Sequence, residues 1–307
     1  MKRLVAIVGP TGIGKSRLAL HLAGLFSGEI IGADSRQVYR YLDIGTAKPS
    51  PEERARVPHH LIDIIYPGED FSLALYQKLA YRAIEDIHHR GKLPFLVGGT
   101  GLYIRAVLEG WKIPEVSPDP QFRYNIEKRA SEGGADDLYE ELARLDPEAA
   151  RKIDRRNVRR VIRALEVYAR AGGPFSKLGR KEPPDFEYYV IGLTADRAAL
   201  YEMVDHRVDE MMERGLVNEV EKIRKMGYDF TLPSLSGIGY RQVAQYLKGE
   251  MILPDAVRKI KTETHRFIRH QYAWFKLTDE KIHWFDARRP DFIEEMEREL
   301  AGFLNNK

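Results

Sequence analysis

Residues 9–16 of the 307-residue chain read GPTGIGKS and match the pattern G-x-x-x-x-G-K-[ST]. A short apolar run, residues 4–8, precedes this loop, and residues 15–26 follow it with apolar side chains at helical spacing. Such a loop turns its backbone N–H groups, and the amino end of the next helix, towards phosphate oxygens. We therefore predict an α/β fold with a phosphate-binding loop (P-loop) formed by Gly9, Pro10, Thr11, Gly12, Ile13, Gly14, Lys15 and Ser16.

Strands and helices alternate through the rest of the N-terminal part. We expect strands at 29–33 and 94–97, a helix at about 72–90, and later strands at 188–193 and 282–285. This alternation predicts a parallel sheet core flanked by helices on both faces. The side chains expected to face the core are Leu18, Ala19, Leu22, Ala23 and Leu25 in the first helix, and Leu75, Leu79, Ala83 and Ile87 in the second.

Two Pro-containing segments, at 111–120 and 181–185, mark domain boundaries. Between them the periodicity is helical and no strand pattern occurs. The sequence thus predicts an inserted all-helical domain at 119–184, within a P-loop core domain made of residues 1–118 and 185–307.

The basic residues are concentrated in the insertion. The chain carries a net charge of only +3, but residues 151–181 contain eleven Lys or Arg and two acids, which gives 11 − 2 = +9. Arg156, Arg159, Arg160 and Arg163 have the spacing of one helix face, which suits a polyanion, although a solvated face is the alternative. A second basic stretch at 256–276 contains aromatic residues that suit either base stacking or core packing.

The P-loop alone does not identify the reaction. Lys15 supplies a full positive charge, and the Ser16 hydroxyl can hold Mg²⁺. Nucleotide hydrolases usually end a second strand in an acid, but strand 94–97 ends in Gly-Gly and then Thr100. Asp34, which ends the other strand, is left with three candidate roles: Mg²⁺ ligand, general base or helix N-cap. A diphosphate leaving group would use the same loop.

Several longer blocks resemble the tRNA dimethylallyltransferase family. They are DSRQVY at 34–39, LDIGTAKP at 42–49, GGTGLY at 98–103 and GIGYRQ at 237–242, and the resemblance runs from the first strand to about residue 286. It implies transfer of a dimethylallyl group from dimethylallyl diphosphate to the N6 amine of the adenine on the 3′ side of the anticodon. Diphosphate is released, and the anticodon stem-loop of tRNA is the implied partner.

The same resemblance implies individual roles. Asp34 matches the general base, Thr100 a residue near the reacting groups, and Arg207 a diphosphate contact. The alternatives are a turn-stabilising role for Thr100 and a solvated helix charge for Arg207. Arg269 and Gln271 also match family positions in the basic helix. The implied tRNA-binding set is Asp34, Ser35, Arg36, Gln37, Thr100, Arg123, Arg159, Arg160, Val161, Ile162, Arg163, Gly239, Tyr240 and Arg241.

Three other functions compete: a P-loop kinase or hydrolase, a prenyltransferase acting on free adenine nucleotides, and a non-catalytic RNA-binding module. The first two leave the basic insertion unexplained, and the third leaves Asp34 unexplained. The chain has no Cys and no long apolar stretch, so we expect a cytoplasmic protein outside the membrane. We also expect a monomer without an obligate protein partner, and no zinc site at the adjacent pairs His59-His60 and His88-His89.

Overall fold

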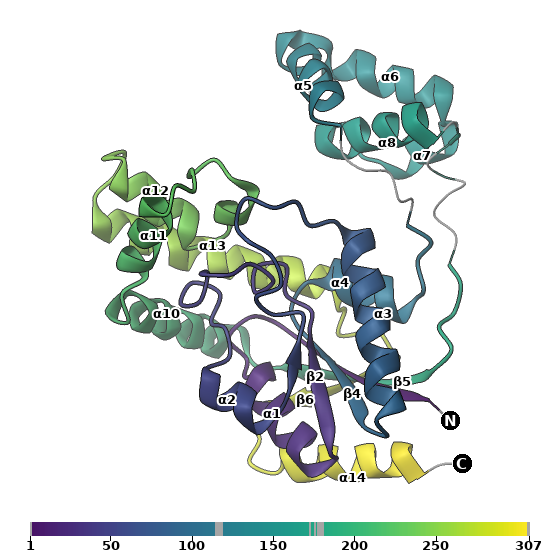
Figure 1. Ribbon diagram of the computed structural model, residues 1–307, viewed down its shortest axis with the longest axis vertical. Coiled ribbons are helices and arrows are strands. Elements are labelled where there is room, and N and C mark those ends of the chain that lie inside the picture. Colours follow the sequence, from purple (N-terminus) through teal and green to yellow (C-terminus); the bar gives the residue numbers. More distant parts are fainter. Residues whose placement is uncertain (1, 114–118, 172, 175, 177–180, 306–307) are drawn as a thin grey trace. The chain divides into compact units, whose positions relative to one another are not determined.

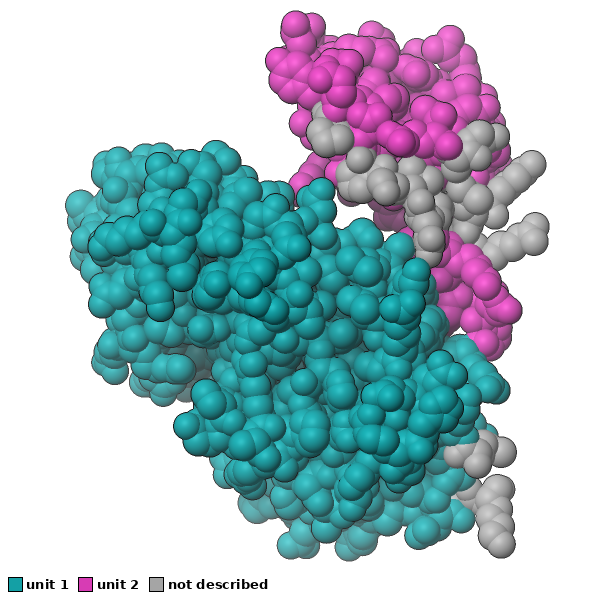
Figure 2. All heavy atoms as spheres, viewed as in Figure 1, with its two compact units in different colours: residues 1–108, 184–307 teal, residues 109–183 magenta. Residues whose placement is uncertain are grey.

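The computed structural model describes residues 2–113, 119–171, 173–174, 176 and 181–305 (Figure 1). It divides into two compact units, residues 1–108 with 184–307 and residues 109–183, which Figure 2 shows in teal and magenta. The first unit contains the sheet, and the described secondary-structure elements of the second are helices. No helix in the described part of the chain combines the length and the apolar character needed to span a membrane.

A six-stranded sheet with the order β3-β2-β4-β1-β5-β6 forms the centre of the first unit, and every neighbouring pair is parallel. The predicted fold class is confirmed. The short strand β3, which pairs with β2, was not predicted. The strands are β1 (Arg3–Val8), β2 (Gly28–Gly32), β3 (His59–His60), β4 (Leu93–Val97), β5 (Glu187–Thr194) and β6 (Ile282–Asp286).

Strand β1 shows why the sheet needs helices on both faces. Its Val5 and Ile7 pack into one apolar cluster with α1 (Lys15–Leu25) and α14 (Phe292–Asn305), while Leu4, Ala6 and Val8 pack into a second cluster with α3 (Leu73–His89) and α4 (Gly101–Leu108). Alternate residues of a strand point to opposite faces, so a strand buried on both faces is apolar throughout.

The buried face of α3 differs from the prediction. Tyr76, Ala80, Ile84 and Ile87 are buried, whereas Leu75 is 38% exposed. Tyr76 takes the core position because its ring stacks on Tyr103 at 3.8 Å between centroids and its hydroxyl donates to Gly32 O. In α1 the expected core residues are buried except Leu25, which is 55% exposed at the last residue of the helix.

A third apolar cluster joins the segment after β2 to the C-terminal helices. Val38 and Leu42 pack there with side chains of α10 (Arg197–Glu213), α11 (Leu216–Lys225), α12 (Tyr240–Leu247) and α13 (Leu253–Trp274). This packing fixes the segment that carries the DSRQVY and LDIGTAKP blocks. The remaining elements of this unit are α2 (Pro51–Arg56) and η2 (Pro233–Ser236).

The helical unit has its own apolar core, to which Ile126, Leu138, Leu142, Val161 and Leu165 contribute. Its boundary at 108/109 lies before the Pro-rich segment, because Trp111 and Lys181 pair in an antiparallel bridge. The expected connector residues 114–118 lie outside the described residues. The elements are α5 (Pro120–Arg129), the π-helical turn η1 (Ala130–Gly134), α6 (Ala135–Leu145), α7 (Pro147–Lys152) and α8 (Val158–Ala171).

Candidate active site

The P-loop connects the carboxyl end of β1 to the amino end of α1, the position at which parallel sheets bind ligands. Gly9 has a φ of 139°, and a Cβ there would lie 2.4 Å from Leu193 O, so a larger residue would displace β5. Gly14, the N-cap of α1, has a φ of 97°, which is left-handed backbone that favours glycine. The predicted loop is therefore built as its glycine pattern requires.

Lys15 turns its amine back into the P-loop. Lys15 Nζ donates to Gly9 O at 3.0 Å and to Pro10 O at 2.7 Å. The pKa of Lys15 is lowered from 10.5 to about 7, mainly by burial of the amine and also by the charge of nearby Arg207, while the charge of Asp34 opposes the shift. The protein alone therefore stabilises the charged form of Lys15 poorly, and a bound anion would stabilise that form.

Arg207 reaches the same loop from α10. Its Nη1 donates to Thr11 Oγ1 at 3.2 Å. Burial lowers the pKa of Arg207, and the charge of Asp34 again opposes the shift. Two cations and one carboxylate therefore act on one another here, so Arg207 is not the freely solvated helix charge that was the alternative.

Asp34 follows β2 and begins a turn rather than a helix. Its Oδ1 accepts from the N–H groups of Arg36 at 2.8 Å and Gln37 at 3.4 Å. Within the described residues, its Oδ2 has no hydrogen-bond partner. One carboxylate oxygen therefore fixes the side chain, and the other is available to a ligand.

Thr100 and Gln271 hold neighbouring loops in place. Thr100 Oγ1 accepts from the N–H of Ser35 at 3.1 Å, which leaves the Thr100 hydroxyl hydrogen to donate elsewhere. Gln271, 3% exposed on α13, accepts from Thr11 N–H at 2.8 Å and donates from Nε2 to Gly99 O at 3.0 Å. The carboxamide thus links the P-loop to the loop after β4. The sequence marked Gln271 but did not reveal this bridge.

The predicted tRNA-binding residues Arg36 and Gln37 both contact protein atoms. Arg36 donates to Ser234 O at 3.2 Å and to Ser236 Oγ at 3.1 Å in η2. Gln37 Nε2 donates to Thr46 O at 3.0 Å and Ala47 O at 3.2 Å. Arg36 therefore holds the turn against η2, whereas the side-chain oxygen of Gln37 remains available to a ligand.

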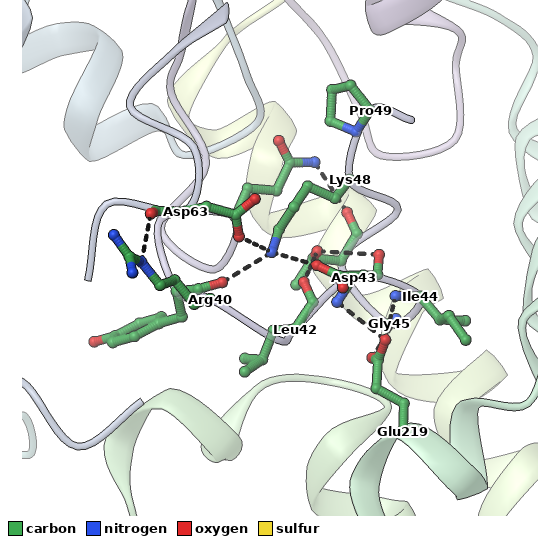
Figure 3. A network of polar contacts seen from close by, with 12 residues as sticks. Arg40, Leu42, Asp43, Ile44, Gly45, Lys48, Pro49, Asp63 and Glu219 are labelled. Carbon is green, nitrogen blue, oxygen red and sulfur yellow. Dashed lines mark hydrogen bonds and ion pairs between the residues drawn. The ribbon is translucent and has the colours of Figure 1, made fainter. Parts of the chain in front are cut away.

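The LDIGTAKP block forms a loop around a buried lysine (Figure 3). The side chain of Lys48 is 1% exposed, and its Nζ contacts Asp43 Oδ1 at 2.6 Å, Tyr39 O at 2.9 Å and also Asp63. Glu219, from α11, accepts from backbone N–H groups of the same loop. Asp63 and Glu219 belong to no sequence pattern that indicates these contacts, so neither residue was predicted.

The GIGYRQ segment is mostly internal. Tyr240 is 1% exposed, with its hydroxyl donating to Glu219 Oε1 at 2.6 Å. Arg241 pairs with Glu263, and Gly239 starts α12 with a φ of 93°. The buried Tyr240 side chain supports the loop instead of facing a ligand, so its predicted contact with tRNA is not available to the side chain.

The basic face of the helical unit is smaller than expected. Arg159 and Arg160 are exposed on α8. Arg163 and Arg123 both pair with buried Glu166, and Arg156 precedes α8 and pairs with Asp154. The predicted contacts Val161 and Ile162 are 1% and 4% exposed in the core of the unit, so their side chains do not face solvent. Arg159 and Arg160 are exposed, whereas the side chains of Arg123 and Arg163 are 37% and 31% exposed and paired with Glu166.

Ser16, the predicted Mg²⁺ ligand, is exposed in the first turn of α1. Its hydroxyl has no hydrogen-bond partner among the described residues and could serve a cation that also contacts phosphate oxygens. No group of three or more His, Asp or Glu side chains with metal-binding geometry occurs in the part of the chain that the structure covers. Magnesium usually keeps several waters and phosphate oxygens as ligands, so one protein hydroxyl fits such a site.

Comparisons with known proteins agree with this geometry. The family model described as IPP transferase matches residues 37–278, and the model described as isopentenyl transferase matches residues 2–61. The tRNA dimethylallyltransferase of Roseiflexus castenholzii is 52% identical over 96% of both chains, and that of Thermomicrobium roseum is 46% identical over 100% of this chain and 93% of its own.

Solved structures give the same result. The tRNA isopentenylpyrophosphate transferase of Bacillus halodurans has a TM-score of 0.73 at 41% identity, covering 99% of this chain and 97% of its own. A eukaryotic dimethylallyltransferase acting on tRNA has a TM-score of 0.85 at 28% identity, covering 100% and 80%. From the sheet, the P-loop and these matches, the chain belongs to the tRNA dimethylallyltransferase family of prenyltransferases.

Proposed function

We propose that this member of the family transfers the dimethylallyl group of dimethylallyl diphosphate to N6 of the adenine 3′-adjacent to the anticodon of tRNA. The observation that carries the proposal is the grouping of Asp34 with Lys15 and Arg207, whose charges act on one another beside the P-loop. A carboxylate with a free oxygen next to two partly buried cations provides a proton acceptor and a diphosphate site in one place.

The reaction follows from these groups. The N6 lone pair forms a bond to the allylic carbon as the bond from that carbon to the diphosphate oxygen breaks, and the diphosphate leaves with the electron pair. The amine becomes acidic as it bonds to carbon, and Asp34 Oδ2 takes its proton. Lys15, Arg207 and the P-loop N–H groups stabilise the charge that develops on the leaving group.

Magnesium would supply further positive charge to the diphosphate when bound, with Ser16 as its protein ligand. Thr100 fixes Ser35 beside Asp34, and its hydroxyl hydrogen can donate to either substrate. Gln37 and Ser35 would read the adenine, and exposed Arg159 and Arg160 would contact phosphates of the anticodon stem-loop.

The test is a transfer assay with labelled dimethylallyl diphosphate, Mg²⁺ and bulk tRNA, in which AMP and ATP serve as parallel acceptors. We expect label in tRNA at the adenine beside the anticodon. Label in AMP or ATP alone would instead indicate a prenyltransferase of free nucleotides. Turnover of ATP without prenyl transfer would indicate a kinase or hydrolase.

A further inference from the structure

Glu219 lies in α11 and accepts hydrogen bonds from three consecutive backbone N–H groups of the loop 42–48 (Figure 3). Its Oε2 accepts from Asp43 N at 3.1 Å and Ile44 N at 2.7 Å, and its Oε1 accepts from Gly45 N at 3.3 Å. Hydrogen bonds to an ionised carboxylate are stronger than those between neutral groups. One side chain thus fixes the path of the loop.

A second contact clamps the same loop against α12. The Tyr240 hydroxyl donates to Glu219 Oε1 at 2.6 Å. The Tyr240 ring lies so close to the loop that a Cβ on Gly45 would be 2.5 Å from its Cε2 atom. The backbone of Gly45 is therefore held on both sides, by Glu219 and by the Tyr240 ring.

The far end of the loop sets the orientation of the Gln37 carboxamide. Thr46 O and Ala47 O both accept from Gln37 Nε2, at 3.0 and 3.2 Å. Carbonyl oxygens only accept, so the NH₂ group of Gln37 must face them and both of its hydrogens are used. Among the described residues, Gln37 Oε1 has no donor. Gln37 therefore presents an acceptor to a ligand, and the exocyclic amine of adenine is a donor.

We propose that Glu219 is a positioning residue for base selection. By fixing residues 43–45, it holds the carbonyl oxygens of Thr46 and Ala47 where they orient Gln37, so that Gln37 Oε1 accepts from a base with an exocyclic amine. This inference rests on the proposed function, in which Gln37 reads the target adenine. Glu219 lies outside the sequence blocks that resemble the family, and Gln37 Oε1 is the acceptor of the hydrogen bond to the base.

The test compares binding of two anticodon stem-loop RNAs, one with adenine and one with purine, which lacks the exocyclic amine, at the target position. The wild type should bind the adenine RNA roughly 5–10-fold more tightly, the value of one hydrogen bond. In Glu219→Ala that ratio should fall towards one, while dimethylallyl diphosphate binds as before. Glu219→Gln keeps one acceptor oxygen for Asp43 and Ile44 and should restore part of the ratio.

Two further variants give controls. Glu221→Gln, on the same helix, removes only a long and half-exposed ion pair to Lys225 and should leave the ratio unchanged. Gln37→Ala should lower the ratio as much as Glu219→Ala does. The double variant Glu219→Ala/Gln37→Ala should then lose nothing more, because both changes remove one coupled interaction.

Equal weakening for both RNAs in Glu219→Ala, with the ratio intact, would overturn the inference and leave Glu219 with a purely structural role. Should Glu219→Ala fail to fold, weaker binding of both RNAs to folded Glu219→Gln, with the adenine-to-purine ratio unchanged from the wild type, would have the same meaning. Failure of the proposed function is separate: the wild type would then transfer no dimethylallyl group to the adenine RNA.

Discussion

Arg123 and Glu166 form a two-point ion pair inside the helical unit, with Arg123 Nε 2.9 Å from Glu166 Oε1 and Arg123 Nη2 2.8 Å from Oε2. The Glu166 side chain is fully buried and also accepts from Arg163 and from the N–H of Asp119. A residue expected to contact tRNA thus neutralises a buried carboxylate that joins α5 to α8.

We expect Arg123→Gln to destabilise the protein by about 1–3 kcal/mol, because a buried charge would lose a partner while Arg163 remains. Arg129→Gln is the matched control on the same helix, since its pair with Glu141 is partly exposed and such pairs contribute about 0–1 kcal/mol. Urea unfolding followed by circular dichroism measures both. A stable Arg123→Gln with weakened tRNA binding would instead support a direct RNA contact.

The environment of Glu166 also predicts that the protein loses stability as the pH falls. Burial alone would raise the pKa of Glu166, but hydrogen bonds from Arg123, Asp119 N–H and Arg163 lower it below 4.5. A carboxyl group whose pKa is lower when folded stabilises the protein above pH 4.5, and that contribution is lost as the pH falls through the folded pKa. Unfolding free energies between pH 3 and 6 should fall less steeply in Glu166→Gln than in the wild type, from a lower starting value.

Local sequence patterns predicted the parallel sheet and its flanking helices because strand burial and helical periodicity are properties of short segments. They could not predict partners distant in sequence. Val161 and Ile162 fall in a basic stretch but face the core, and Arg163 pairs with Glu166, which Arg123 also contacts. Gln271 and Glu219 act through backbone atoms of loops far away in the chain, and no residue pattern records such contacts.

Reversing the accessible charges, with Arg159→Glu and Arg160→Glu together, should raise the tRNA KM and flatten its dependence on salt, because each lost phosphate contact reduces the slope. The KM for dimethylallyl diphosphate should stay within about twofold of the wild-type value. The matched control is Lys92→Glu with Lys281→Glu, an equal charge change at exposed residues that precede β4 and β6, at the amino edge of the sheet. Unchanged tRNA binding at low salt would exclude α8 as an RNA surface.

Donor binding should depend on pH through Lys15. The pKa of Lys15 is about 7 in the free protein, and a bound diphosphate raises it. Below pH 7 Lys15 is already protonated, so affinity should be flat; above pH 7 binding takes up a proton, and affinity should fall by up to roughly tenfold per pH unit. Calorimetry at pH 8 in buffers of different ionisation enthalpy measures the uptake, which Lys15→Met should abolish.

Lys15→Ala removes a full positive charge from the P-loop. In the wild type this charge stabilises the negative charge that develops on the leaving diphosphate. Losses of this type lower the rate by roughly 10²–10³-fold. Single-turnover transfer at saturating donor and tRNA isolates this step from binding. Arg17→Ala, an exposed position two residues further along α1, is the control and should transfer normally. Wild-type rates in Lys15→Ala would remove the P-loop from the mechanism.

Asp34→Asn separates the three roles left open for this residue. Asparagine keeps an oxygen that can accept from the N–H groups of Arg36 and Gln37, so the turn should survive. It places an amide where Oδ2 was and cannot take a proton from the attacking amine. The general-base role predicts that kcat of Asp34→Asn falls by roughly 10²–10⁴-fold, while the Kd values for tRNA and donor stay nearly unchanged.

Asp229→Asn provides the control for Asp34, because Asp229 Oδ1 likewise accepts from the N–H two residues ahead, at 2.9 Å from Thr231 N, on an exposed turn. It should alter neither kcat nor binding. A Mg²⁺-ligand role for Asp34 would appear differently, as weakened donor binding that extra Mg²⁺ partly restores. A role confined to the turn would leave kcat near normal in Asp34→Asn, since asparagine also caps well. That last result, with both Kd values intact, would overturn the proton transfer proposed for Asp34.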